Sequence, residues 1–161
     1  MTSEQISGYD KKIKKDCIQY SLKWSPYILG EKFNVLKKLT EMTGLYVVFS
    51  LNKYKRLIPV ILGASWYTGL RPTVLKIFTP TSVDVIPLSV TQKLEDQKLY
   101  IKYIEIYSLD DFLNIFFKLK EHYKEAFVDT NGLEAPAGLE FVKIVDDDTK
   151  TYHKKVTTST K

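Results

Sequence analysis

Cysteine and histidine are scarce in this 161-residue chain, which contains one cysteine, Cys17, and two histidines, His122 and His153. A single cysteine excludes an internal disulfide framework and a cysteine-based zinc site, and it is typical of a reducing compartment. We interpret Cys17 as a small structural side chain. Neither histidine has a partner four residues away, so the sequence gives no support for a metal site. We predict no metal ion and no cofactor.

Glycine and long apolar runs are also limited. The seven glycines never fall into a nucleotide-binding spacing, and no serine lies between glycines as in a nucleophile elbow. No segment approaches the roughly 18 apolar residues of a membrane span. Residues 1–10 lack the apolar middle of a secretory signal. The sequence therefore predicts an intracellular chain without a membrane span, and it does not support small-molecule catalysis.

What the sequence does contain is enough apolar material for a core, with 44% hydrophobic and 13% aromatic residues. The 24 lysines and arginines exceed the 19 acidic residues, which gives a net charge of +5. A mild basic excess is compatible with RNA, DNA or an acidic protein partner, and it does not choose among them.

The first half of the chain predicts a helix followed by a hairpin. Apolar residues recur at helical spacing over 31–42, and Gly44 stands where a left-handed cap is expected. Residues 45–51 and 54–62 read as two strands joined at Asn52 and Lys53. Pro59 cannot donate to a ladder, so we expect a bulge or an edge there. Residues 63–73 are predicted as a loop and 74–79 as a short strand.

The second half predicts one interior strand, one helix and a closing strand pair. Residues 99–107 carry apolar side chains on both faces. Ser108 offers an N-cap, with Asp110 and Asp111 in the first turn of a helix that runs to about Phe127. Residues 139–145 and 149–156 read as two strands around an acidic turn.

These elements predict a compact single α+β domain with a mixed or antiparallel sheet and flanking helices. We expect residues 1–15 to form a basic arm, either mobile or a frayed helix start, and residues 16–156 to form the domain. Residues 81–98 are expected to be an irregular insertion, and residues 157–161 a tail.

One weak resemblance is to the GIY-YIG endonucleases. Gly44-Leu45-Tyr46 and Ile61-Leu62-Gly63, with Ser65 and Arg71, are similar to the hairpin of that family. However, Ile61 replaces the second tyrosine. Ile115, Phe116 and Phe117 stand where the family's helix carries a metal-binding glutamate. The resemblance therefore implies a degenerate nuclease at most.

A wider resemblance covers roughly residues 31–156. The segment 139–156, an apolar strand, an acidic turn and a tyrosine-bearing strand, is similar to the end of the tRNA-splicing endonuclease C-terminal domain. Its small non-catalytic subunit, the Sen-fifteen type, also resembles this chain at Gly69-Leu-Arg-Pro72, at Ile77-Phe-Thr-Pro80 and at Tyr107-Ser108-Leu109. Tyr152-His153 departs from the usual Tyr-Tyr pair, and residues 157–161 lack the expected Asp-Gly and Lys-Pro.

The resemblance implies a structural role. Catalytic subunits of that family use a tyrosine, a histidine and a lysine to activate the ribose 2′-hydroxyl and protonate the leaving oxygen. Residues 54–108 contain no histidine where those subunits place it. We therefore expect a non-catalytic subunit of a heterotetramer with catalytic and structural partners, in the nucleus or alternatively in the cytoplasm, including the mitochondrial surface. In isolation, such a subunit is expected to self-dimerise.

The resemblance also implies the interface. The acidic turn would dock on a basic cleft, and the last strand would pair with a catalytic subunit. A solvated acidic turn and an edge blunted by Lys150, Lys154 and Lys155 remain the alternatives. These interface residues are Asp146, Asp147, Asp148, Thr149, Tyr152 and Val156. Two basic clusters are expected to attract tRNA phosphates indirectly or weakly: Lys11, Lys12, Lys14 and Lys15, and Lys53, Lys55 and Arg56. The rival hypothesis is a free-standing basic RNA-binding or adaptor module.

Overall fold

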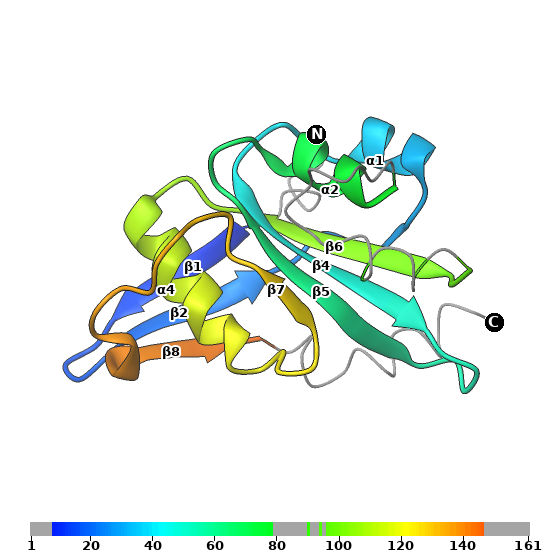
Figure 1. Ribbon diagram of the computed structural model, residues 1–161. Coiled ribbons are helices and arrows are strands. Elements are labelled where there is room, and N and C mark those ends of the chain that lie inside the picture. Colours follow the sequence, from blue (N-terminus) through cyan, green and yellow to red (C-terminus); the bar gives the residue numbers. More distant parts are fainter. Residues whose placement is uncertain (1–7, 79–89, 91–93, 95, 147–161) are drawn as a thin grey trace.

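A computed structural model describes residues 8–78, 90, 94 and 96–146, and it confirms the α+β class. The described strands form two sheets (Figure 1). The smaller sheet has the order β1-β2-β8, with β1 at Gly8–Ile13, β2 at Ile18–Lys23 and β8 at Val142–Val145. Strands β1 and β2 are antiparallel, whereas β2 and β8 are parallel.

The larger sheet has the order β3-β6-β4-β5-β7. Strand β4 (Gly44–Leu51) pairs antiparallel with β5 (Leu57–Ser65) and with β6 (Leu99–Glu105). Two short strands close the edges, β3 (Ile28–Leu29) beside β6 and β7 (Phe127–Asp129) parallel to β5. Strand β6 is therefore interior, as its apolar pattern predicts.

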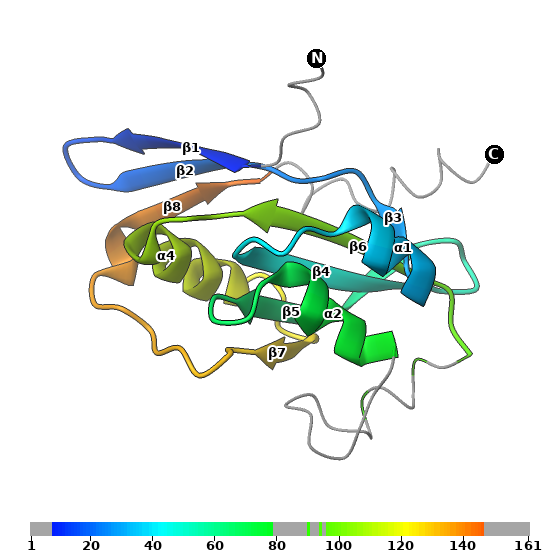
Figure 2. The ribbon, with the colours of Figure 1, turned by 90° about the horizontal axis from the view of Figure 1, so that it is seen from above.

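Of the α-helices with described bounds, two cover one face of the larger sheet (Figures 1 and 2). Helix α1 (Lys32–Lys38) and helix α2 (Leu70–Phe78) pack against Tyr46, Val48, Ile61 and Ile101 in one apolar core. Alternation along β4 sends Tyr46 and Val48 to this face and Leu45, Val47 and Phe49 to the other. The near-continuous apolar run of β4 thus reflects burial on both faces.

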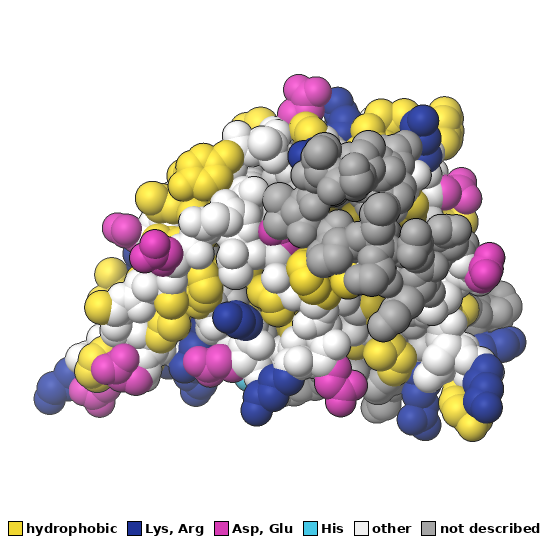
Figure 3. All heavy atoms as spheres, viewed as in Figure 1, with side chains coloured by type: hydrophobic (Ala, Val, Ile, Leu, Met, Phe, Trp, Pro, Cys, Tyr) yellow, Lys and Arg dark blue, Asp and Glu magenta, His cyan; other side chains and the backbone are white. Residues whose placement is uncertain are grey.

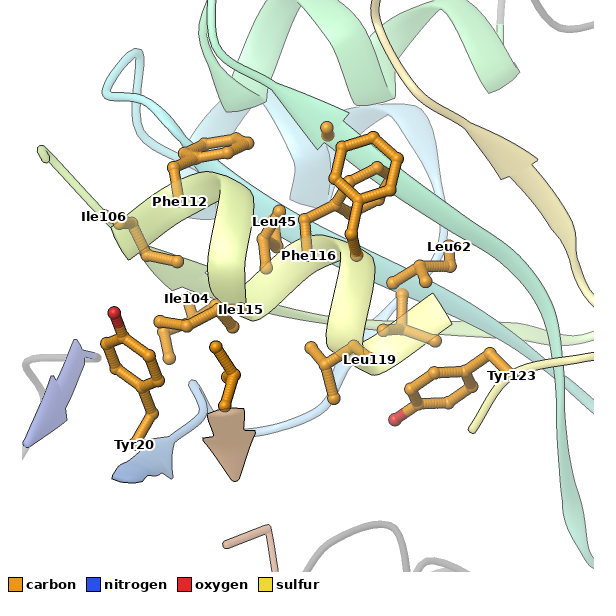
Figure 4. Packing of buried hydrophobic residues seen from close by; sticks show 14 of the residues in the cluster. Tyr20, Leu45, Leu62, Ile104, Ile106, Phe112, Ile115, Phe116, Leu119 and Tyr123 are labelled. Atoms are coloured by element: carbon orange, nitrogen blue, oxygen red, sulfur yellow. The ribbon is translucent and has the colours of Figure 1, made fainter. Parts of the chain in front are cut away.

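The opposite face of the larger sheet packs against helix α4 (Leu109–Lys120) and the smaller sheet. Figure 4 shows Phe112, Ile115, Phe116 and Leu119 of α4 directed into this second core, together with Tyr20 from β2. As predicted, Ser108 caps the helix, with its Oγ accepting from the backbone N of Asp111 at 3.4 Å. The apolar stripe of α4 therefore joins the two sheets.

Several predicted boundaries are wrong. Residues 8–13 of the expected arm form β1 instead. Helix α1 ends at Lys38 because Leu39 is already extended, with ψ of 146°. Gly44 is no helix cap but the first residue of β4. A Cβ there would lie 2.3 Å from the carbonyl oxygen of Ile104, so close strand packing requires the glycine.

Other predictions gave the wrong type of element or the wrong end of a helix. The described part of the predicted strand over 74–79, residues 74–78, is the end of α2, whose Leu70, Thr73, Val74 and Ile77 are buried at helical spacing. Helix α4 ends at Lys120, well before the expected Phe127, which begins β7. The first part of the predicted strand over 139–145 is a short 3-10 helix, η2 (Leu139–Phe141). The expected irregularity at Pro59 is confirmed, because the β4–β5 register shifts between Val48 and Phe49.

Candidate functional site

Asp146 is the one predicted interface residue that the structure describes, and the structure places it inside the fold. Its side chain is only 5% exposed, and its Oδ1 accepts a hydrogen bond from Nε1 of Trp24 at 3.0 Å. The solvated acidic turn, the alternative to docking, therefore does not hold at Asp146, whose carboxylate is buried and hydrogen bonded to the indole. Asp147, Asp148, Thr149, Tyr152 and Val156 lie outside the described residues.

Lys102 lies close to the same indole. This side chain of β6 is fully buried, with its Nζ 4.2 Å from the ring centroid of Trp24 and 5.4 Å from that of Phe49. Both distances suit cation–π attraction, which is stronger where water is excluded. Sequence reasoning missed Lys102, because a lysine in a strand is normally expected to face solvent.

A second carboxylate, Asp111, receives hydrogen bonds from both strands of the β1–β2 hairpin. The hydroxyl of Tyr9 donates to Oδ2 at 2.5 Å, and the hydroxyl of Tyr20 donates to Oδ1 at 2.7 Å. The Nζ of Lys11 lies 2.9 Å from Oδ1. We call Tyr9, Lys11, Tyr20 and Asp111 the Asp111 cluster. It fastens the hairpin to the first turn of α4, where a carboxylate also suits the helix dipole.

Electrostatics within this cluster favour the ionised carboxylate. Burial raises the pKa of Asp111, but hydrogen bonds from Tyr9, Lys11 and Tyr20 outweigh burial and lower the pKa below the usual 3.8. Burial raises the pKa of Tyr20 to about 12, and the hydrogen bond to Asp111 and the negative charge of Asp111 add to this rise. A hydrogen bond from Asn114 opposes it. At neutral pH the cluster is therefore a carboxylate held by two protonated phenols and an ammonium.

A third group of polar side chains lies under α2. Tyr46, Gly63 and Asp129 are direct neighbours across β4, β5 and β7. Both Tyr46 and Asp129 are buried, and the hydroxyl of Tyr46 has no hydrogen-bond partner among the described residues. Burial raises the pKa of Asp129, against the lowering effects of the Asn131 backbone and Lys76. A Cβ on Gly63 would lie 2.1 Å from Cζ of Tyr46, so the ring occupies the space above that glycine.

Beside this row, hydroxyl and amide groups fix the loop between β5 and α2. Ser65 Oγ and Thr68 Oγ1 both hydrogen bond with Thr73 Oγ1, at 2.7 and 2.6 Å. Asn131 Oδ1 accepts from the backbone N of Trp66 at 3.0 Å. These bonds stabilise the turn that leads into α2.

The segments that resemble a GIY-YIG hairpin do pair with one another, with Tyr46 opposite Gly63 and Gly44 opposite Ser65. Their side chains are nevertheless committed to the fold. Tyr46 is 0% exposed. Arg71 uses Nε to donate to the carbonyl of Leu39 at 2.9 Å and pairs with Glu41 at 3.2 Å. Ile115, Phe116 and Phe117 of α4 belong to the core on the opposite face of the sheet.

The two predicted basic clusters lie at opposite ends of the molecule (Figure 1). Lys11 and Lys12 lie on β1, and Lys14 and Lys15 lie in the turn that joins β1 to β2. Lys53, Lys55 and Arg56 lie in the turn that joins β4 to β5. The structure does not bring the two clusters together. Lys11 also pairs with Asp111, so its charge is partly balanced within the fold.

Of the two histidines, the structure describes His122. His122 is exposed in the turn after α4, and His153 lies outside the described residues. Within the ranges 8–78 and 96–146, with Val90 and Leu94, no group of three or more His, Cys, Asp or Glu side chains is placed to hold a metal ion. None of the helices described there is long and apolar enough to cross a membrane.

Comparison with known proteins places this fold in a family. A family model described as "Uncharacterised protein" matches residues 5–156, which is most of the chain. The chain belongs to that family. No curated protein and no solved structure matches it. The comparison covers both sheets and all the described helices, and its description assigns no activity.

Proposed function

We propose that this chain is a non-catalytic structural subunit of a tRNA-splicing endonuclease, which pairs with a catalytic subunit and positions it for intron excision. The observation that supports a non-catalytic role is that the buried charged side chains make contacts within the fold. Asp111 fastens a hairpin to α4, and Asp146 accepts from Trp24. Lys102 lies against aromatic rings. Charged groups committed in this way stabilise a fold and are poorly placed to exchange protons with a substrate.

The identity of the assembly rests on the motif resemblance alone. What supports pairing through the C-terminal region is the position of β8. Among the described residues, β8 has one strand neighbour, β2, and it leads directly into the acidic run that starts at Asp146. A strand with a single neighbour presents backbone groups that a second chain can pair with.

Affinity purification of the tagged full chain tests this proposal. Lys143→Glu changes an exposed side chain on β8, whereas Lys12→Glu makes the same charge reversal on β1, at the other edge of that sheet. We expect a nuclease subunit to co-purify with the wild-type chain and with the Lys12 variant, and to be depleted with the Lys143 variant. Equal recovery with both variants would contradict docking along β8, and recovery of no nuclease with the wild-type chain would contradict the assembly itself.

A nuclease of the GIY-YIG type is the second candidate, and one observation favours it. The two motif segments pair in register, and α2, which carries Arg71, follows directly. The burial of Tyr46 and the commitment of Arg71 to Leu39 and Glu41 oppose it. Metal-dependent cleavage of DNA or RNA by the pure chain, lost in both Tyr46→Phe and Arg71→Lys, would favour this candidate over the subunit. An inactive chain would dismiss it.

A further inference from the structure

We propose that the turn between β4 and β5, residues 52–56, is a binding site for single-stranded nucleic acid, in which a base stacks on Tyr54 while neighbouring cations hold phosphates. The proposal goes beyond the assembly role and rests on this turn alone. Tyr54 is 70% exposed at the tip of the turn. The same five residues contain Lys53, Lys55 and Arg56 and no acidic residue.

The turn is rigid, because hydrogen bonds close it from both sides. The side-chain Oδ1 of Asn52 accepts from the backbone N of Tyr54 at 2.9 Å and of Arg56 at 3.0 Å. The backbone N of Asn52 donates to the carbonyl of Arg56, and that of Lys55 donates to the carbonyl of Asn52, both at 3.0 Å. Binding therefore costs little ordering of the backbone, which is the advantage of a preorganised site.

The cations lie close to the exposed ring. The Nζ of Lys53 is 5.2 Å from the ring centroid of Tyr54, and Lys53, Lys55 and Arg56 are all exposed. In Figure 3, dark blue Lys and Arg side chains surround yellow hydrophobic ones at this end of the molecule, at the lower right. An aromatic ring among cations is the arrangement with which proteins bind single strands, because every base offers a π-face and every nucleotide a phosphate.

A second pair of a lysine and a tyrosine lies next to the turn. The backbone N of Leu51, at the end of β4, donates to the carbonyl of Lys98 at 2.9 Å. The Nζ of Lys98 lies 5.8 Å from the ring centroid of Tyr100, the second residue of β6. Acidic residues near this end include Asp96, two positions before Lys98, and Glu31, which follows the Gly30 that bonds to Leu99. Tyr100 is half-buried and packs against the core, so among these described residues Tyr54 supplies the exposed ring and Lys98 adds an exposed positive charge beside it.

The β1–β2 hairpin, which carries the other basic cluster, fits this ligand less well. Lys11 is paired with Asp111, and the Nζ of Lys14 donates to Gln19 Oε1 at 2.8 Å. The large exposed side chain of that hairpin is aliphatic, Ile13 at 78% exposed. It can bring positive charge to a strand but offers no exposed ring on which a base could stack.

Fluorescence anisotropy with the full-length chain tests the stacking. The probes are labelled oligouridylate, oligothymidylate of the same length, and a blunt RNA duplex. We expect Tyr54→Ala to weaken single-strand binding about 5-fold or more, the lower end for loss of one stacked base. Tyr67→Ala is the matched control, because Tyr67 is 69% exposed at the opposite end of β5. It should bind like the wild-type chain.

The two single strands distinguish RNA from DNA as the source of the ligand. Tyr54-dependent binding of either oligonucleotide supports the site. The oligonucleotide that binds more tightly shows whether the ligand is RNA or DNA. Binding of neither by the wild-type chain, equal affinity in the Tyr54 and Tyr67 variants, or duplex binding as tight as single-strand binding overturns it. Circular dichroism confirms that each variant is folded.

A charge series tests the phosphate contacts. Changing Lys53, Lys55 and Arg56 to Gln should reduce the slope of log affinity against log salt by about 2, at about 0.7 per phosphate for a single strand. Changing Lys12, Lys14 and Lys15 to Gln removes the same charge from the β1–β2 hairpin and should reduce the slope less. The reverse result would overturn the location. These measurements use the isolated chain, so their failure is distinguishable from failure to recover a nuclease partner.

Discussion

The variant Asp111→Ala tests how the β1–β2 hairpin of the smaller sheet is held to helix α4. The change removes the acceptor of two phenolic hydrogen bonds and one ammonium contact. A hydrogen bond to a charged group contributes about 1.5–3 kcal/mol, and the half-exposed Lys11 pair adds less than about 1 kcal/mol. Because contacts on one group are not additive, we expect a loss of about 3 kcal/mol, or a fall in Tm of about 6–12 °C for a domain of this size.

Urea unfolding at neutral pH, followed by tryptophan fluorescence, measures this loss. Asp110→Ala is the matched control: Asp110 lies in the same first turn but is exposed, so its removal should cost less than about 1 kcal/mol through the helix dipole. If the two variants are equally stable, the Asp111 cluster does not fasten the hairpin to α4 and the reasoning is refuted.

The same cluster predicts a dependence on pH. The pKa of Asp111 is lowered in the folded protein, so its contribution is complete above the usual 3.8 and is lost as the pH falls through the lowered folded value. Unfolding measured along an acid series should therefore show a smaller loss of stability in Asp111→Ala than in the wild-type chain. Parallel curves would contradict this assignment.

The remaining predictions concern the polar row under α2. Tyr46→Phe removes a buried hydroxyl that has no partner among the described residues, so it should stabilise the fold by about 1 kcal/mol in urea unfolding; destabilisation would argue against an unsatisfied group. Gly63→Ala should cost about 3 kcal/mol through the clash with the Tyr46 ring. Tyr46→Ala should then destabilise the Gly63→Ala chain less than it destabilises the wild-type chain, which a double-mutant cycle of thermal melts will show. The raised pKa of Asp129 means that wild-type stability increases as the pH falls through that raised value toward 3.8. Asp129→Asn, which keeps an acceptor for the Asn131 backbone, should lack that increase, and an unchanged pH profile would contradict it.

Local patterns predicted the elements whose signals lie within a few residues. The apolar run of β4 and the capping serine of α4 are signals of this kind. Helix α2 was missed because Val74 and Ile77 are β-branched and favour strands in isolation, whereas in the fold they bury against the sheet. Strand β7 was missed because its parallel pairing with β5 joins residues that are far apart in the chain.

The polar clusters were harder to predict than the elements. Asp111 was expected only as a first-turn acid, because its partners Tyr20 and Tyr9 lie 91 and 102 residues away in the sequence. Asp146 reads as the start of an acidic turn, and only the position of Trp24 shows that it is buried. Such contacts depend on how the two sheets pack, which no local pattern encodes.

The proposed role is tested most directly by intron excision. Tagged full-length chain is recovered from cells, and both the eluate and the pure recombinant chain are incubated with intron-containing pre-tRNA. The proposal predicts that the eluate excises the intron, that a separate nuclease subunit is present in it, and that the recombinant chain alone is inactive. An eluate without intron excision, or excision by the recombinant chain alone that is lost on changing His122 or His153, would contradict the role of a non-catalytic splicing-endonuclease subunit.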